Sequence, residues 1–223
     1  MHIPDGFVSA PINAAAFAVS VAVCGAAVVR ANHTLGERQV PLLGMTAAFI
    51  FAAQMLNFPV LTGTSGHFLG AVLAAVLLGP LNACLILALV LLVQCLLFSD
   101  GGLTALGSNV FNMGVVGGIG GYAVFRLLLS LLPKTRAGFM AAAAAASWTS
   151  IVAAAISCAV ELAISGTSPL ALALPAMAGV HALIGIGEAF ITCATLSVIL
   201  ASRPDLVGAW TKSAVSPQLE GER

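Results

Sequence analysis

The stretch FLGAVLAAVLLGPLNACLILALVLLVQCLLF, residues 68–98, is apolar almost from end to end and decides the architecture of this chain. As a single helix it would be roughly 46 Å long, too long for one upright crossing of a bilayer core about 30 Å thick. It is also too short for two full crossings. Gly79–Pro80 lies inside it, and proline does not continue a helix. The stretch is therefore either one long helix or a hairpin that turns at Gly79–Pro80.

The composition around this stretch is that of a membrane protein. Of the 223 residues, 60% are hydrophobic and only 7% are charged, whereas soluble domains carry about 25% charged residues. The formal net charge is zero, and no basic patch suggests a nucleic-acid partner. We expect one transmembrane domain over residues 1–223, embedded in the lipid bilayer. Further apolar spans lie at 12–30, 41–56, 109–131, 138–163 and 173–200.

The basic residues decide between one helix and a hairpin. If residues 68–98 form a hairpin, the chain has seven helices and every basic residue falls on one side. If they form one helix, Arg30 and Arg38 are separated from the other six. The positive-inside rule favours the hairpin and makes the basic side cytoplasmic. We therefore predict an all-α integral membrane protein with seven transmembrane helices, an external amino terminus folded back into the bundle, and a cytoplasmic tail over about 204–223. The eight basic residues are Arg30, Arg38, Arg126, Lys134, Arg136, Arg203, Lys212 and Arg223.

The external side of this arrangement is polar and acidic. Its loops carry Asp5 and Asp100 but no Lys or Arg. The third helix would have only about eleven residues, so the loop before it would dip below the membrane surface, which requires protein or a cavity to satisfy its backbone. The sequence thus predicts a partly sunken external vestibule. The loops that form it are 1–11, 57–67, 99–108 and 164–171.

The first two residues, Met1 and His2, can chelate a metal ion. The Met1 amine, the His2 amide nitrogen and the His2 Nδ1 atom close two adjacent chelate rings, leaving one in-plane position open. Such all-nitrogen sites suit Cu(II) or Ni(II), and low-spin Co(II) is electronically close. Pro4 and the Asp5–Gly6 turn in the metal-binding segment 1–11 would aim it inward. We expect His67, at the start of the short third helix, to fill the fourth position. The competing interpretation is an incidental histidine on a poorly ordered terminus.

Five other polar residues are candidates for supporting roles. A metal-bound imidazole needs its second nitrogen held by a partner, and Ser65, Asn109 and Asn112 are candidates. The two asparagines, one helical turn apart, would either orient ligands or cap the fifth helix. Ionisable residues inside a membrane suggest function. His181 and Glu188 share one helix face, and either form a polar pair that locks the bundle, which we favour, or belong to a pathway.

Sequence motifs bear on two enzyme classes, ATPases and serine proteases. The chain has no Walker A motif, so we expect a transporter subunit without its own ATPase and not an enzyme. The tetrapeptide GTSG at 63–66 allows an alternative, an intramembrane serine protease with Ser65 as nucleophile and His181 as base. A purely structural subunit is a third possibility, and it predicts no tight metal binding.

Four motifs, MHIPDGF, GTSGHFLG, NVFNMG and GVHALIGIGEA, together resemble the CbiM/NikM family, the substrate-binding components of energy-coupling-factor cobalt and nickel transporters. The resemblance covers residues 1 to about 200 and is greatest to CbiM. It implies that four nitrogens hold the metal: the Met1 amine, the His2 amide, the His2 imidazole and the His67 imidazole.

The resemblance also implies partners: a CbiQ-like transmembrane coupling protein, a CbiO-like ATP-binding protein and a CbiN-like auxiliary membrane protein. Nickel members often carry the auxiliary part fused at the carboxyl end. This chain stops after a short tail, as in the cobalt arrangement. We expect import of Co(II) for cobalamin biosynthesis across a bacterial inner membrane. Ni(II) uptake is the alternative, because the first-row affinity order puts Ni(II) above Co(II) and the site itself does not decide between them.

Overall fold

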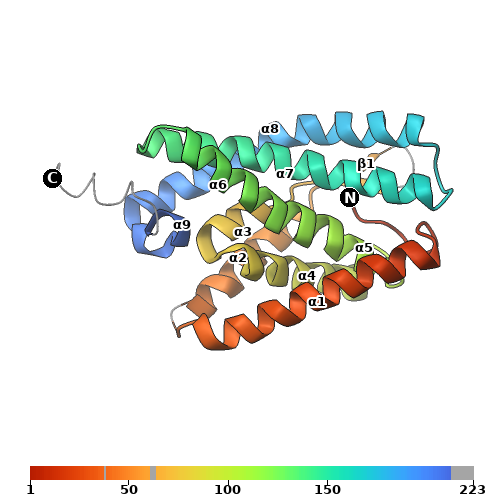
Figure 1. The fold of residues 1–223 in the computed structure, drawn as a ribbon, viewed down its shortest axis with the longest axis horizontal. Helices are drawn as coiled ribbons and strands as arrows, with labels where there is room; N and C mark the ends of the chain where they lie inside the picture. Colours follow the sequence, from red (N-terminus) through yellow and green to blue (C-terminus); the bar gives the residue numbers. More distant parts are fainter. Residues whose placement is uncertain (38, 61–63, 212–223) are drawn as a thin grey trace.

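The computed structural model describes residues 1–37, 39–60 and 64–211. The basic residues Arg38, Lys212 and Arg223, residue Gly63 of the GTSG motif, and positions 212–223 of the predicted tail lie outside the described residues. The elements, in chain order, are α1 (Ala10–Thr34), α2 (Gln39–Gln54), β1 (Asn57–Val60), β2 (Thr64–His67), α3 (Ala71–Leu78), α4 (Pro80–Phe98), α5 (Leu106–Val110), the π-helical stretch η1 (Phe111–Gly120), α6 (Gly121–Leu131), α7 (Arg136–Ile164), α8 (Leu170–Ser202), the 3-10 turn η2 (Pro204–Leu206) and α9 (Gly208–Thr211) (Figure 1).

Helices long and apolar enough to cross a membrane dominate the described part of the chain. Five meet that criterion, with α5, η1 and α6 counted as the continuous helix Leu106–Leu131. Helix α2 is a shorter apolar helix of 16 residues. Four predicted spans lie wholly inside observed helices. The fifth, 41–56, overruns the end of α2, because strand β1 begins at Asn57.

Residues 68–98 form two helices that meet at Gly79, as the hairpin arrangement predicted. Gly79 adopts φ +93°, a conformation that favours glycine, and Pro80 occupies the first turn of α4. Helix α3 has 8 residues, fewer than expected. It starts at Ala71 because Gly70 has the left-handed conformation, with φ +75°, and Glu188 accepts from the backbone N–H groups of Leu69 and Gly70 just before it.

The loop before α3 contains an antiparallel hairpin that the sequence did not predict. Strand β1 pairs with β2 in the register Asn57↔His67 and Val60↔Thr64. The prediction that His67 begins the third helix was therefore wrong, since His67 ends β2. By pairing with each other, the two strands satisfy backbone groups that would otherwise be buried without partners.

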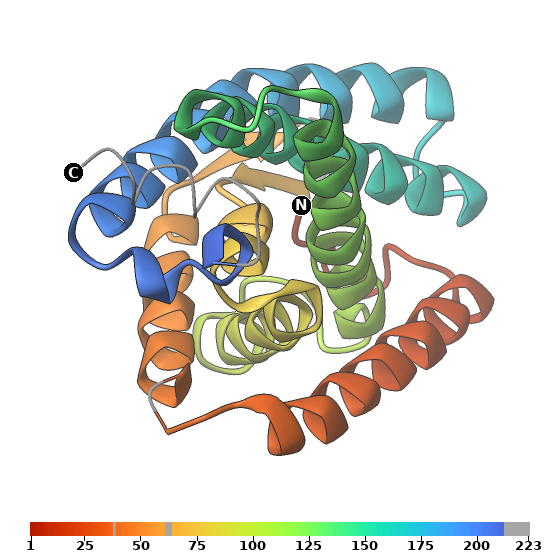
Figure 2. The same cartoon turned by 60° about the vertical axis from the view of Figure 1, so that its left-hand side comes forward.

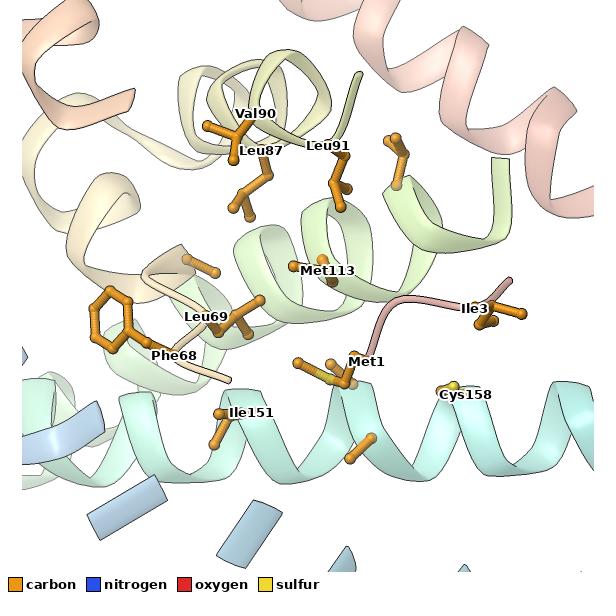
Figure 3. Packing of buried hydrophobic residues seen from close by; sticks show 14 of the residues in the cluster. Met1, Ile3, Phe68, Leu69, Leu87, Val90, Leu91, Met113, Ile151 and Cys158 are labelled. Atoms are coloured by element: carbon orange, nitrogen blue, oxygen red, sulfur yellow. The ribbon is translucent and has the colours of Figure 1, made fainter. Parts of the chain in front are cut away.

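Helix α3 lies in the middle of the molecule, with longer helices around it (Figure 2). Its residues Ala71–Leu77 are all buried, as expected for a helix that is apolar on every side. The amino terminus also lies inside the bundle (Figure 1). Met1 and Ile3 are fully buried in the same apolar cluster as Leu69, Met113 and others, and Figure 3 shows Met1 next to α7. The amino terminus thus meets the short β-hairpin, where Ser65 of β2 contacts Met1 and His2.

Candidate metal-binding site

Backbone contacts hold the amino-terminal segment in place. The Met1 amine donates to the Ser65 carbonyl and lies 3.3 Å from the Ser65 hydroxyl, which also accepts from the His2 N–H at 3.3 Å. The Ile3 N–H donates to Asn109 Oδ1 at 2.8 Å, and Asn109 Nδ2 donates back to the Ile3 carbonyl at 3.2 Å. Gly102 N–H donates to the same carbonyl at 2.8 Å. These hydrogen bonds hold residues 1–3 against strand β2, helix α5 and the loop that contains Gly102.

The two predicted ligand imidazoles lie against each other. The His2 and His67 rings are stacked with centroids 4.3 Å apart and planes inclined by 29°. His67 Nδ1 lies 2.7 Å from the Phe68 carbonyl, so Nδ1 carries the proton and Nε2 carries the lone pair. That Nε2 atom is buried and has no hydrogen-bond partner in the described part of the chain. His2 Nδ1 lies 2.6 Å from Asp100 Oδ1.

Burial lowers the pKa values of these nitrogens. Burial lowers the pKa of the Met1 amine from 8.0 to about 5. Burial also lowers the pKa of His2, against the opposing effect of Asp100, and lowers the pKa of His67 well below its ordinary value. Unprotonated nitrogens are the form in which amines and imidazoles bind metal ions. The docked terminus is therefore chemically prepared to act as a set of nitrogen donors.

A cavity of about 600 Å³ opens beside His2. Asp5 and Asp100 both line it, so its wall is acidic. Thr104 donates both its N–H (2.7 Å) and its hydroxyl (2.6 Å) to Asp5 Oδ1, and these bonds lower the pKa of Asp5. The cavity gives a cation an acidic approach to the His2 side chain.

The two asparagines do not contact the imidazoles. Asn109 clamps the backbone of Ile3, and so holds the segment that carries the predicted ligands. Asn112 Nδ2 donates to Glu161 Oε2 at 2.8 Å. Neither caps its helix with its side chain. Asn109 therefore positions the amino terminus, while Asn112 ties η1 to α7.

His181 and Glu188 are both buried, but they do not form a pair. His181 Nδ1 lies 2.7 Å from the Met177 carbonyl. The carboxylate of Glu188 accepts from Leu69 N–H at 2.7 Å and from Gly70 N–H at 2.8 Å. Glu188 thus has a structural role, in a different contact from the predicted one.

Two glutamines that the sequence analysis did not single out complete this support. Gln94 Nε2 donates to Gln54 Oε1 at 3.0 Å, and Gln54 Nε2 donates to the Leu69 carbonyl at 3.0 Å. The carbonyl of Leu69 is thereby held by Gln54 and its N–H by Glu188, two residues after His67. The available signal was an isolated glutamine inside each of two apolar helices, which calls for a partner.

The serine protease alternative lacks its catalytic contact. His181 Nε2 has no hydrogen-bond partner among the described residues, so it does not accept from the Ser65 hydroxyl. A serine nucleophile requires a base within hydrogen-bond reach. Ser65 instead contacts the Met1 amine and the His2 N–H.

These features define a multi-pass membrane protein whose amino terminus is buried beside two imidazoles. Residues 2–206 match the profile of the CbiM family, described as the cobalt uptake substrate-specific transmembrane region. The chain belongs to the CbiM family, and it is a cobalt/nickel transport protein of the membrane.

Individual relatives and a solved structure agree with this assignment. The chain is 44% identical over 209 residues to a protein of Archaeoglobus fulgidus provisionally named as a fused nickel transport protein, NikMN, covering 93% of this chain and 68% of the relative. It is 40% identical over 222 residues to a provisionally named metal transport protein of Haloquadratum walsbyi, covering 99% and 100%. A crystal structure of a truncated transition metal transporter superposes with a TM-score of 0.83 at 36% identity, covering 90% of this chain and 99% of that one.

Proposed function

We propose that this chain is the substrate-specificity subunit of an ATP-driven energy-coupling-factor transporter that imports Co(II) for cobalamin biosynthesis. The observation that carries the proposal is the buried amino terminus, where the Met1 amine contacts Ser65 and the His2 ring stacks on His67. Burying an amine and two imidazoles together costs free energy. A divalent cation that binds their lone pairs offsets this cost, so the arrangement suits a metal-binding site.

Four nitrogens form the proposed ligand set: the Met1 amine, the His2 amide and Nδ1, and His67 Nε2. The Phe68 carbonyl already fixes the His67 tautomer with Nε2 free, which is the outer support that a ligand imidazole needs. His2 Nδ1 must leave Asp100 to join the chelate. Asp100 therefore holds the His2 ring at the cavity wall until an ion arrives.

The proposed cycle begins in the acidic cavity. A hydrated cation is drawn to Asp5 and Asp100, and exchanges its water for the nitrogens of Met1, His2 and His67. The external loops close over it, and the partner proteins then use ATP to reorient or open this subunit. In this proposal the membrane domain consists of the seven helices α1, α2, α3, α4, α5–α6, α7 and α8, and the loop before the short α3 dips into the membrane from the outer side. The amino terminus lies outside and the tail in the cytoplasm.

The partners in this proposal are a CbiQ-like coupling protein, a CbiO-like ATPase and a CbiN-like auxiliary protein. Four alanines one helical turn apart on α1 support a docking role. They are exposed, so they do not pack inside the bundle, and small residues allow close approach of a second helix in a membrane. These residues are Ala14, Ala18, Ala22 and Ala26.

Ni(II) is the second candidate substrate. Support comes from the relative named for fused nickel transport, which is 44% identical, and from the greater affinity of nitrogen ligands for Ni(II) than for Co(II).

Calorimetric titration of the purified chain with Co(II) and Ni(II) tests the proposal. We expect His67→Ala to lower the affinity by about 100-fold or more, because a ligand is lost, and Ser65→Ala to lower it by less than about tenfold, because the Ser65 carbonyl still contacts the Met1 amine. The protease alternative requires the Ser65 hydroxyl and not His67. Equal affinity of His67→Ala and the unmodified chain would contradict the proposed site.

A further inference from the structure

Three buried polar atoms in helices α7 and α8 have no hydrogen-bond partner in the described part of the chain: Ser147 Oγ, His181 Nε2 and Thr192 Oγ1. Helical hydroxyls usually bond to the carbonyl one turn back, as Thr46 does to Leu42 at 2.7 Å and Thr149 does to Ala145 at 2.7 Å. Buried groups without partners cost free energy and need an explanation. We call Ser147, His181 and Thr192 the inner polar row.

His181 lies opposite strand β2. One turn before it, Met177 Sδ accepts from the Thr64 hydroxyl at 3.0 Å. Just after it, Ile184 Cδ1 lies so close to Gly66 that a Cβ there would be 2.7 Å away. His181 therefore lies on the part of α8 that packs against β2, the strand that carries His67.

The His181 ring presents a lone pair. Its Nδ1 lies 2.7 Å from the Met177 carbonyl and so carries the proton. Its Nε2 has no donor to accept from in the described residues, although His181 is fully buried. An unprotonated imidazole nitrogen is a good ligand for Co(II) and Ni(II).

The other two members continue inward from His181. Helices α7 and α8 lie side by side (Figure 1), with Trp148 Nε1 donating to the Ala182 carbonyl at 3.0 Å. Cys193 Sγ lies 3.5 Å from the Met140 carbonyl. These contacts place Ser147, the residue before Trp148, at the level of the turn of α8 that follows His181.

Thr192 lies further along the same face of α8, about 16 Å from His181 along the helix axis. Beyond it the face is apolar, since Leu196 and Leu200 join the cluster that contains Phe139. The polar atoms thus run from the metal site to the middle of the bundle and stop at an apolar closure.

We propose that the inner polar row is the route by which the metal leaves the amino-terminal site, and that His181 is the first group to take it. This inference rests on the proposed function. His67 keeps its bond while His181 Nε2 and water molecules take the places of the three nitrogens of Met1 and His2, and the released His2 amide regains from solvent the proton that it lost on binding. The ion stays divalent throughout, so no reductant or oxidant is needed. The hydroxyls of Ser147 and Thr192 then supply oxygen ligands, and the apolar closure opens when the partner proteins act.

The test separates equilibrium binding from transport. Titration of the purified variants His181→Gln and His181→Leu should give Co(II) and Ni(II) affinities within about threefold of the unmodified chain, because both variants keep the amino-terminal ligands. Uptake of radioactive Co(II) or Ni(II), in cells whose uptake depends on this chain and its partners, should fall by about tenfold or more. Normal uptake by His181→Leu would overturn the inference, and so would a fall in affinity as large as the fall in uptake.

Thr192→Val provides a second variant if His181 is needed for folding. It removes only the unpartnered hydroxyl and should slow uptake without changing affinity. Thr149→Val is the matched control, because its hydroxyl is exposed and bonded within α7. Equal uptake by Thr192→Val and Thr149→Val would count against the route. If the unmodified chain bound neither metal ion, the proposed function itself would fail, which is a different result from normal uptake by the His181 variants.

Discussion

Asn109 is the side chain on which the position of the amino terminus depends most. Its amide both accepts from the Ile3 N–H and donates to the Ile3 carbonyl, as a neighbouring strand would. The apolar side chains of Met1 and Ile3 add about 1.5–3 kcal/mol each when fully buried. Together these contacts offset the cost of burying the amine.

Asn109→Leu should weaken metal binding although Asn109 is not a ligand. The change leaves the buried Ile3 N–H without an acceptor, at a cost of about 1–3 kcal/mol, so we expect the affinity for Co(II) to fall by about tenfold. Calorimetric titration measures this. Asn82→Leu is the control, because Asn82 bonds to the Leu78 carbonyl where α3 meets α4. Equal Co(II) affinities of the two variants would contradict the role of Asn109 in holding Ile3.

The pH dependence of binding follows from the lowered pKa values. A bound His2 amide has lost a proton, so affinity should fall about tenfold per pH unit between pH 8 and 6. The Met1 amine adds nothing in this range, since burial lowers its pKa to about 5. Below about pH 5 protons also compete for the amine, and the decline should steepen. Titrations across this range measure the slope, and a flat affinity from pH 5 to 8 would rule out the chelate.

The sequence could predict the ligand candidates but not all their supports. Met1 and His2 are adjacent, so their chelate follows from covalent geometry alone. Gln54 and Gln94 lie on different helices, so the bond between them, and the bond from Gln54 to the Leu69 carbonyl, depend on tertiary packing. Asn109 was singled out, but its contact with Ile3 spans more than a hundred residues of sequence and required the fold.

At the scale of elements, the segment 68–70 links strand β2 to α3 and fixes the end of the strand that carries His67. Glu188 holds its N–H groups, and Gln54 holds one of its carbonyls. Gly70 adopts φ +75°, a conformation that other residues rarely adopt. The position of His67 therefore depends on contacts from α2 and α8 as well as on β2.

Gly70→Ala should lower both thermal stability and metal affinity. A Cβ at Gly70 would lie 2.6 Å from Ile50 Cγ1, in addition to the strain of its positive φ. Because the crowding displaces the segment that follows His67, we expect the affinity to fall by about tenfold. Gly79→Ala is the control, since Gly79 also has a positive φ but nothing within 4 Å. It should lower the unfolding temperature while leaving affinity unchanged, and equal losses of affinity would contradict this explanation.

The helix break at Gly79–Pro80 was predictable because it depends on two adjacent residues. The β-hairpin was not, because its strands are short and β2 contains two small polar residues and a glycine, Thr64 to Gly66. Its stability comes from pairing and from packing against α8, where a Cβ at Gly66 would meet Ile184. The π-helical stretch η1 was likewise predicted only as regular helix.

At the scale of the whole molecule, the proposed orientation follows from charge. The positive-inside rule places Lys134 in the cytoplasm, and the cavity lined by Asp5, Asp100 and Leu103 outside. The positions of the apolar spans alone do not give this orientation, because an apolar helix can cross a membrane in either direction.

Cysteine labelling measures the orientation directly. In a chain whose five native cysteines are replaced, Leu103→Cys should react with a membrane-impermeant maleimide on intact cells, since Leu103 is exposed. Lys134→Cys should react only after the membrane is permeabilised. The reverse pattern would mean that the acidic cavity faces the cytoplasm.

The central claim is that the free amine of Met1 is a metal ligand, and one added residue tests it most directly. An alanine placed before Met1 moves the amine away from His2 and His67 and leaves every side chain in the bundle unchanged. Calorimetric titration of the native and extended chains with Co(II) and Ni(II) compares the two. The proposed site predicts one tightly bound ion in the native chain and no tight binding in the extended chain. Unchanged affinity after the extension would contradict it.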